Sequence, residues 1–203
     1  FTNSALEFPA LGSAEFNGAS DYIQLNDPFS HTNHTIAAWV YANDTTALKS
    51  IFDNRDGSNN GVILCSFIDE NILYQVNGVN QFSAPYSNEW IFVVGTNNGA
   101  TQKLYINGSL SNSSVNTSSV SSTTDARIGR ESYIAGGYYN GNLANVAIWN
   151  RALHSDEINA IMWKSYGDLN AVDKNGLQAW YALDNITGTT VPDSTGTNNG
   201  TAN

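Results

Sequence analysis

The sequence contains a single cysteine, Cys65, so no disulfide framework can form within the chain. Cys65 lies in the apolar run 61–68, and free cysteines are among the residues most often buried. We therefore expect Cys65 to be a small core residue. A lone cysteine does not identify the compartment in which the protein works.

Positive charge is also scarce. Eight Lys and Arg residues stand against eighteen Asp and Glu residues, which gives a formal net charge of −10. This charge opposes the phosphate attraction that supplies most nucleic-acid affinity, so we exclude nucleic acids and anionic membranes as partners. The sequence also lacks an apolar run of about 18 residues, which excludes membrane insertion. Because the chain begins with Phe1 rather than Met, we expect a processed or excised piece.

The sequence does contain many short apolar segments with turn residues between them. Hydrophobic residues make up 41% and charged residues 13%, so a sizeable core can form under a surface of Asn, Ser, Thr and Gly. The clearest apolar segments are 22–25, 36–41, 61–68, 72–76, 90–95, 103–106, 126–128 and 142–149. Asn-Gly pairs, which suit tight hairpin turns, stand at 77–78, 98–99 and 107–108. The pattern predicts an all-β sandwich or barrel of antiparallel strands.

Two segments depart from this pattern. Residues 109–124 are nearly all Ser, Thr, Asn and Val, which suits either a polar strand with loops or a flexible excursion. Residues 155–163 have apolar residues at helical spacing, Ser155 can cap the first amides, and acidic residues follow it. We predict one short helix over residues 155–163.

Six motifs in order carry a family resemblance. They are AEFNGASDY at 14–22, IAAWV at 36–40, EWIFV at 89–93, LYING at 104–108, IGR at 128–130 and GNLANVAIWNRAL at 141–153. Together they resemble the laminin-G-like, pentraxin-like branch of the concanavalin A-like lectin and glucanase superfamily, over about residues 5–163. The resemblance implies a two-sheet antiparallel jelly-roll sandwich with the short helix at one edge. Trp39 and Trp90 stand within apolar strands and are expected in the core.

The predicted organisation has three parts: a laminin-G-like module at 1–167, a linker at 168–176 and a tail at 177–203. The apolar start of the tail, 177–183, resembles the leading strand that usually precedes such a module, yet here it follows one. The tail therefore completes this sandwich, docks on another copy, or begins a further repeat.

Catalytic residues are not legible in the sequence. β-Glucanases of this fold carry carboxylates at alternating strand positions, whereas Asp69 and Glu70 are adjacent and would face opposite sides of a strand. His31 and His34 lie in a polar segment and His154 precedes the expected helix cap, so we interpret all three as solvated loop histidines. We predict that the chain is not an enzyme.

A calcium site is a further prediction. The loop 53–60 collects oxygen ligands around a Gly turn, as Ca²⁺ prefers. In pentraxins the corresponding loop supplies Asp and Asn to calcium, and a loop after an Ile-Gly pair supplies Glu. By this resemblance we expect Asp56, Asn59 and Glu131 to bind Ca²⁺. The chain departs from the family pattern at Tyr133, and an ordinary polar hairpin loop is the alternative.

The candidate ligand-binding residues are Arg130, Tyr133, Tyr138 and Tyr139, in and beside the Gly-rich stretch 131–141. Aromatic faces on a loop can stack on the C–H surfaces of sugars, and a guanidinium can pair with hydroxyl or carboxylate groups. Strand alternation indicates that Tyr138 or Tyr139 is a core residue.

These features favour a non-catalytic recognition module for carbohydrate, on a secreted, cell-surface or virion protein, with a glycan or surface polysaccharide as its partner. The alternative is a structural or assembly module, as in a capsid decoration, fibre or extracellular filament, which contacts neighbouring copies or other structural proteins. A neutral surface rich in Asn, Ser and Thr fits both.

Overall fold

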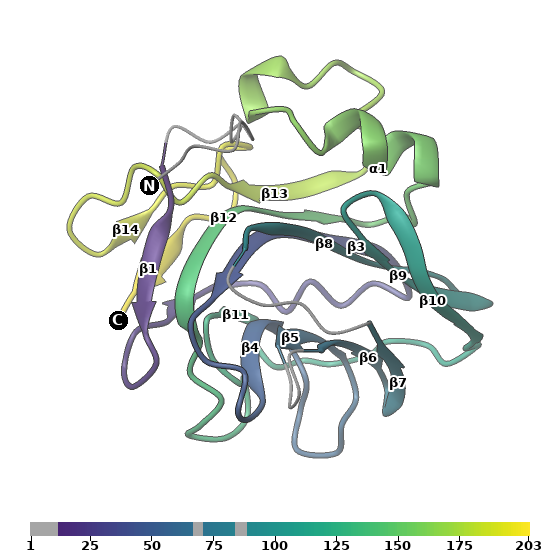
Figure 1. The fold of residues 1–203 in the computed structure, drawn as a ribbon, viewed down its shortest axis with the longest axis horizontal. Coiled ribbons are helices and arrows are strands. Elements are labelled where there is room, and N and C mark those ends of the chain that lie inside the picture. The colour runs from purple at the N-terminus through teal and green to yellow at the C-terminus, as the bar shows by residue number, and fades with distance from the viewer. Residues whose placement is uncertain (1–11, 67–70, 84–88) are drawn as a thin grey trace.

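The computed structural model describes residues 12–66, 71–83 and 89–203, and it shows two antiparallel β-sheets packed face to face (Figure 1). The predicted all-β sandwich with one short helix is confirmed. Asp69 and Glu70 lie outside the described residues.

The first sheet has seven strands, in the spatial order β1 (Ala14–Asn17), β12 (Asn140–Trp149), β3 (Asn33–Ala42), β8 (Ile91–Asn98), β9 (Thr101–Ile106) and β10 (Ser109–Val115), with β13 (Leu177–Tyr181) also paired to β12. The second sheet has eight strands, in the order β14 (Thr190–Val191), β15 (Gly200–Ala202), β2 (Ile23–Gln24), β11 (Arg127–Ile128), β4 (Lys49–Asp53), β5 (Val62–Ser66), β6 (Ile72–Val76) and β7 (Val79–Phe82).

The main core lies between the two sheets, and a second apolar cluster lies on the outer face of the first sheet. On β3, Ile36 and Val40 point into the main core, while Ala37 and Trp39 point outward into the second cluster. Both faces of β3 are therefore buried, which explains why its sequence is a continuous apolar run. Trp39 is a core residue as predicted, and Trp90 is partly buried against the same cluster.

The helix α1 (Ser155–Ile161) covers the second cluster, with Ile158 and Ile161 buried (Figure 1). It is shorter than the predicted span 155–163, because the chain tightens into a turn in which the Lys164 N–H donates to the Ile161 carbonyl at 3.0 Å. The predicted cap was also wrong. His154 is the N-cap in an extended conformation, and its N–H donates to the Glu157 carboxylate at 2.9 Å.

The polar segment begins as a strand and continues as a loop. Residues 109–115 form β10 at the edge of the first sheet, and Val115 there is 77% exposed. Leu110, also in β10, is 54% exposed, so this edge strand presents apolar side chains among its polar ones. Asn77 and Asn107, which begin two of the Asn-Gly turns, have φ of 46° and 49° as tight hairpins require.

The tail pairs with both sheets of the same chain. Strand β13 pairs with β12 in the first sheet, and β15 pairs with β2 in the second. The segment 168–176, which the sequence indicated as a linker, is packed and begins at the last residue of the 3-10 helix η2 (Tyr166–Asp168). Within it Leu169 and Asp173 are buried, and the Trp149 indole N–H donates to the Asp173 carbonyl at 2.9 Å.

Candidate functional site

The loop between β11 and β12, residues 129–139, holds all four predicted ligand-binding residues, and we call it the rim loop. Gly129 donates its N–H to the Ile51 carbonyl at 3.1 Å, and Ser50 donates to the Gly137 carbonyl at 2.8 Å. The loop closes where the Tyr139 N–H reaches the Gly129 carbonyl at 2.9 Å. Both ends of the rim loop are therefore tied down, and the excursion between them carries the side chains.

Arg130 lies on a small aromatic cluster. Its guanidinium carbon is 4.9 Å from the ring centre of Tyr22 and 5.1 Å from that of Tyr138, and the two ring centres are 6.4 Å apart. The Arg127 guanidinium also lies 5.6 Å from the Tyr22 ring centre. Burial, followed by repulsion from Arg130, lowers the pKa of Arg127. Among the described residues neither arginine forms an ion pair, so two cations share this cluster without a carboxylate in direct contact.

Tyr133 and Tyr139 lie in opposite environments. The Tyr133 side chain is 39% exposed, and the Arg55 guanidinium lies 5.5 Å from its ring centre. Tyr139 is fully buried in the main core, where its ring meets Phe16 edge to face at 6.1 Å. Tyr139 is therefore the core member of the tyrosine pair and is not available to a ligand.

A buried ion network lies beneath Tyr133. Arg55 Nη2 donates to Asp53 Oδ2 at 2.8 Å and to Glu131 Oε1 at 3.1 Å, and Arg55 Nε reaches both oxygens of Asp53 at 3.1 and 3.2 Å. Ser132 also donates to Asp53 Oδ1 at 3.2 Å. Burial raises the pKa of both Asp53 and Glu131, and Arg55 opposes this rise. The guanidinium is thus the charge that partly offsets the burial of both carboxylates.

The three predicted calcium ligands do not form a cation site as they lie. Asn59 Oδ1 and Glu131 Oε1 both face Arg55, at 3.4 Å from Nη1 and 3.1 Å from Nη2, so a guanidinium already fills the space between them. The Asp56 carboxylate accepts hydrogen bonds within its own loop, from the N–H groups of Ser58 and Asn60 at 2.8 and 3.0 Å and from the Asn60 amide at 3.0 Å. Calcium binding stays a prediction, and it requires Arg55 to leave.

One of the three histidines differs from its predicted solvated setting. His34 is in β3 and only 2% exposed, with Nε2 2.6 Å from the Tyr74 hydroxyl across the sandwich. The interpretation of His34 as a solvated loop residue was therefore wrong. His154 is exposed as predicted, but it is the N-cap of α1 rather than the residue before the cap.

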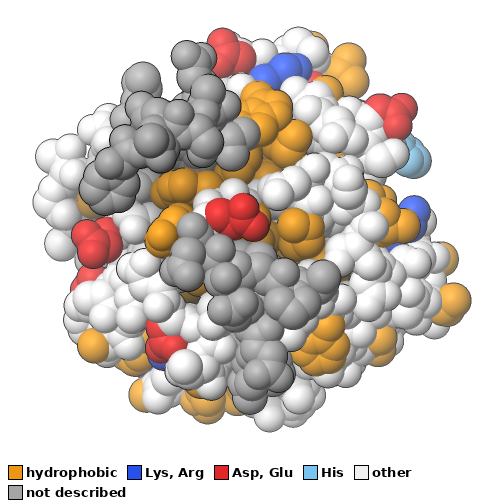
Figure 2. All heavy atoms as spheres, in the orientation of Figure 1, with side chains coloured by type: hydrophobic (Ala, Val, Ile, Leu, Met, Phe, Trp, Pro, Cys, Tyr) orange, Lys and Arg blue, Asp and Glu red, His pale blue; other side chains and the backbone are white. Residues whose placement is uncertain are grey.

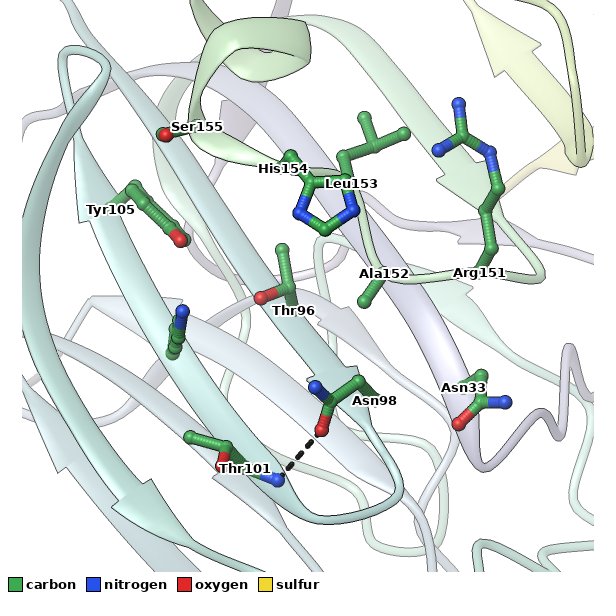
Figure 3. Close-up of a pocket in the computed structure, with 11 residues that line it drawn as sticks. Asn33, Thr96, Asn98, Thr101, Tyr105, Arg151, Ala152, Leu153, His154 and Ser155 are labelled. Atoms are coloured by element: carbon green, nitrogen blue, oxygen red, sulfur yellow. Dashed lines mark hydrogen bonds between the residues drawn. The ribbon is translucent and has the colours of Figure 1, made fainter.

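A pocket that no sequence pattern indicated lies on the outer face of the first sheet, beside the start of α1 (Figure 3). Its volume is about 310 Å³. The lining residues are Asn33, Thr96, Asn98, Thr101, Lys103, Tyr105, Arg151, Ala152, Leu153, His154 and Ser155. In the sequence, the strand residues among them resemble ordinary polar surface positions. The segment 151–155, which forms one wall of the pocket, lies about fifty residues further along the chain, so no local pattern joins the two.

In Figure 2, uncharged side chains and backbone cover much of the described surface in view, with hydrophobic areas and a few separate charged side chains among them. Within the part of the chain that the structure describes, no helix is long and apolar enough to cross a membrane.

A two-sheet sandwich with a cation–aromatic cluster on a rim loop defines a lectin-like β-sandwich. The chain belongs to the concanavalin A-like lectin/glucanases superfamily, whose family model matches residues 17–159. A search of curated proteins finds no match.

Solved structures share the fold at low sequence identity. A proposed carbohydrate binding protein from Bacteroides ovatus superposes with a TM-score of 0.77 at 20% identity, over 94% of this chain and 57% of that structure. The SAP-like pentraxin of Limulus polyphemus gives 0.61 at 19% identity, over 73% and 80%. Domain 4 of the Geobacillus stearothermophilus arabinanase AbnA, solved with arabinotriose, gives 0.58 at 16% identity, over 74% and 76%. This chain spans little more than half of the Bacteroides structure.

Proposed function

We propose that this chain is a non-catalytic carbohydrate-recognition module that binds a glycan or surface polysaccharide at the rim loop. In this proposal it works on a secreted, cell-surface or virion protein. Its superfamily and the shared fold with a carbohydrate-binding arabinanase domain support the proposal. Fold alone does not fix function, so the argument depends on the chemistry of the rim loop.

The observation that carries the proposal is Arg130, held over Tyr138 with no carboxylate partner among the described residues, on the same loop as the exposed Tyr133. The Tyr133 ring can stack on the C–H face of a sugar, and Arg130 can donate to its hydroxyl or carboxylate groups. The ring contacts and a 3.4 Å bond from Arg130 Nη2 to the Ile134 carbonyl already orient the guanidinium, which reduces the entropy lost on binding.

The buried carboxylates of the site do not suit hydrolysis. Glycoside hydrolysis needs one carboxyl group to donate a proton and another to act on the sugar or on water. Asp53 is fully buried beneath Arg55, and Glu131 is bound to the same guanidinium. Neither group can transfer a proton to a sugar without breaking this network, which supports a binding role.

A glycan array with three variants tests the proposal. Tyr133→Ala removes the exposed ring and Arg130→Gln removes the guanidinium, and we expect each to weaken binding of the recognised glycan by about tenfold. Ile186→Ala is the matched control, because Ile186 is 38% exposed and lies outside the rim loop. Binding that both rim-loop variants leave unchanged would place the glycan elsewhere.

The alternative, an assembly module, predicts a different result from the glycan array and from light scattering. If the wild-type protein binds no glycan but associates as its concentration rises in light scattering, the structural role replaces recognition. Strand β10, at the edge of the first sheet, would then be the first surface to vary.

A further inference from the structure

The pocket on the outer face of the first sheet lies where the cover of that sheet ends. The second apolar cluster and α1 cover β12 and β3, and the residues that lead into α1 form one wall of the pocket (Figure 3). Strands β8 and β9 form its floor. This pocket is on the opposite sheet from β4 and β11, which carry the rim loop.

The floor holds hydroxyl groups without protein partners. Thr96 is 3% exposed and Tyr105 is 4% exposed, and neither side chain forms a hydrogen bond with a described residue. In Figure 3 the Tyr105 hydroxyl points into the pocket from one side and Thr96 lies at its centre. Neither hydroxyl oxygen is among the fully buried unpaired atoms of the described residues, so both remain open to the pocket and can bond to a ligand or to water that a ligand replaces.

Lys103 adds a cation to the same floor. It lies directly opposite Thr96 in the β8–β9 pairing. All eight Lys and Arg residues are within the described ranges, and seven of them form an ion pair, a hydrogen bond or a ring contact there. Lys103 forms none with any described residue. The described residues that line the pocket include no carboxylate, although the whole chain carries a net charge of −10.

The other walls complete the polar lining. Asn33 faces Asn98 across the β3–β8 pairing, and the His154 ring projects over Thr96 in Figure 3. Arg151 is committed elsewhere, because its guanidinium binds the Glu157 carboxylate at 2.7 and 2.9 Å and points away from the pocket. The available groups are therefore one ammonium with several hydroxyl and amide groups around it.

We infer that this pocket is a second ligand site for an acidic sugar unit, a small hydroxylated ring that carries one carboxylate. Lys103 pairs with the carboxylate, and Tyr105 and Thr96 bond to ring hydroxyls. The volume of about 310 Å³ is at the lower end of the range for ligand pockets, roughly 300–1,000 Å³, which suits a single terminal or branch unit. The inference does not depend on binding at the rim loop.

Amide-detected NMR titration with two matched sugars tests the inference. Methyl β-glucuronide and methyl β-glucoside have the same ring and hydroxyls, but the first has a carboxylate where the second has a hydroxymethyl group. We expect the glucuronide to bind about tenfold more tightly, with shift changes centred on Thr96 and Lys103. Lys103→Gln should abolish the difference between the sugars, and Tyr105→Phe should weaken both by about threefold to tenfold because it removes only a hydroxyl.

A charge control separates the pocket from general electrostatic attraction. Lys174→Gln removes a cation that stacks on Tyr166 at 4.2 Å and lines no part of the pocket. It should leave the glucuronide affinity of the pocket unchanged. Equal affinities for the two sugars, or a difference that survives Lys103→Gln, would overturn the inference. Shift changes confined to the rim loop would also overturn it while supporting the proposed function.

Discussion

His34 illustrates how burial sets the state of a single side chain. Its Nδ1 lies 2.7 Å from the His31 carbonyl, which can only accept, so Nδ1 carries the proton. Nε2 is then the acceptor for the Tyr74 hydroxyl at 2.6 Å. Burial lowers the pKa of His34 from 6.5 to about 4, although the backbone hydrogen bonds oppose this. His34 is therefore neutral at physiological pH.

This lowered pKa predicts a loss of stability in mild acid. Between pH 6.5 and 4 the unfolded chain takes up a proton at His34 and the folded chain does not, so the free energy of unfolding falls as the pH falls. At roughly 1.4 kcal/mol per pH unit, the loss is on the order of 3 kcal/mol. Urea denaturation of wild type and His34→Gln at pH 7, 6, 5 and 4 measures it.

The variant should lose less stability than wild type over this range. His31→Gln, a change in the same segment at a partly exposed residue, should follow wild type and serves as the control. If wild type and His34→Gln have parallel stability curves, the buried neutral histidine is not the cause.

The sequence predicted the setting of a residue correctly where its neighbours in the sequence determine that setting. It failed where a residue distant in the sequence determines it. Cys65 is buried, as its apolar run indicated. Arg55 was not singled out, because its pairing with Glu131 joins residues 76 positions apart. Tyr22 was missed for the same reason, since its neighbour Arg130 comes from a different strand connection. The rim loop could be recognised from its glycines and aromatic residues, but its cationic cluster could not.

At the scale of elements, Asp193 joins β13 to the end of the chain. Its carboxylate accepts from the Trp180 N–H at 2.8 Å, the Thr195 N–H at 3.0 Å and the Asn198 N–H at 3.0 Å, and also from the Thr195 hydroxyl. Burial alone would raise the pKa of Asp193, but these hydrogen bonds outweigh it and the pKa is lowered. The carboxylate is thus the centre of the tail's local structure.

Asp193→Asn should therefore destabilise the fold and reduce its sensitivity to strong acid. We expect the free energy of unfolding to fall by about 2 kcal/mol at pH 7. Both oxygens of a carboxylate accept hydrogen bonds, whereas an amide can accept only with its single oxygen. The stabilisation by Asp193 is present above its unfolded pKa of about 4 and is lost as the pH falls through the lower folded value. Thermal melting from pH 5 to pH 2 checks this. Ser194→Ala is the neighbouring control, and an equal acid response in Asp193→Asn and wild type would contradict the prediction.

Elements with both faces buried were predictable, and the shortest strands were not. Strands β3 and β12 read as long apolar runs because the main core and the second cluster cover opposite faces. Strands β14 and β15 have two and three residues and exist through pairing with each other and with β2. No local pattern marks such strands, because the partner strand supplies their stability.

At the scale of the whole molecule, the first described strand, β1, and the first strand of the tail, β13, share one edge of β12. Strand β1 pairs with Leu143 and the residues before it, and β13 pairs with Val146 and the residues after it. Between the two strands, Asn145 adopts φ of 48° and donates its N–H to the Ala182 carbonyl at 3.2 Å. Strand β13 is thus the second half of an edge that β1 leaves open.

Truncation after Gly167 is therefore expected to destabilise the protein. The cut removes Trp180, Tyr181 and Leu183, which are 3%, 0% and 4% exposed, from the two cores. At roughly 1.5 to 3 kcal/mol for each large buried side chain, the loss is several kcal/mol. It also leaves half of the β12 edge unpaired, which favours aggregation. Calorimetry and size-exclusion chromatography of the truncated chain measure both effects.

Because the truncated chain can fail to fold, co-expression with residues 168–203 as a separate chain is the companion measurement, and it should restore solubility. A soluble truncated monomer with the original melting temperature would show that the tail contributes nothing to this sandwich.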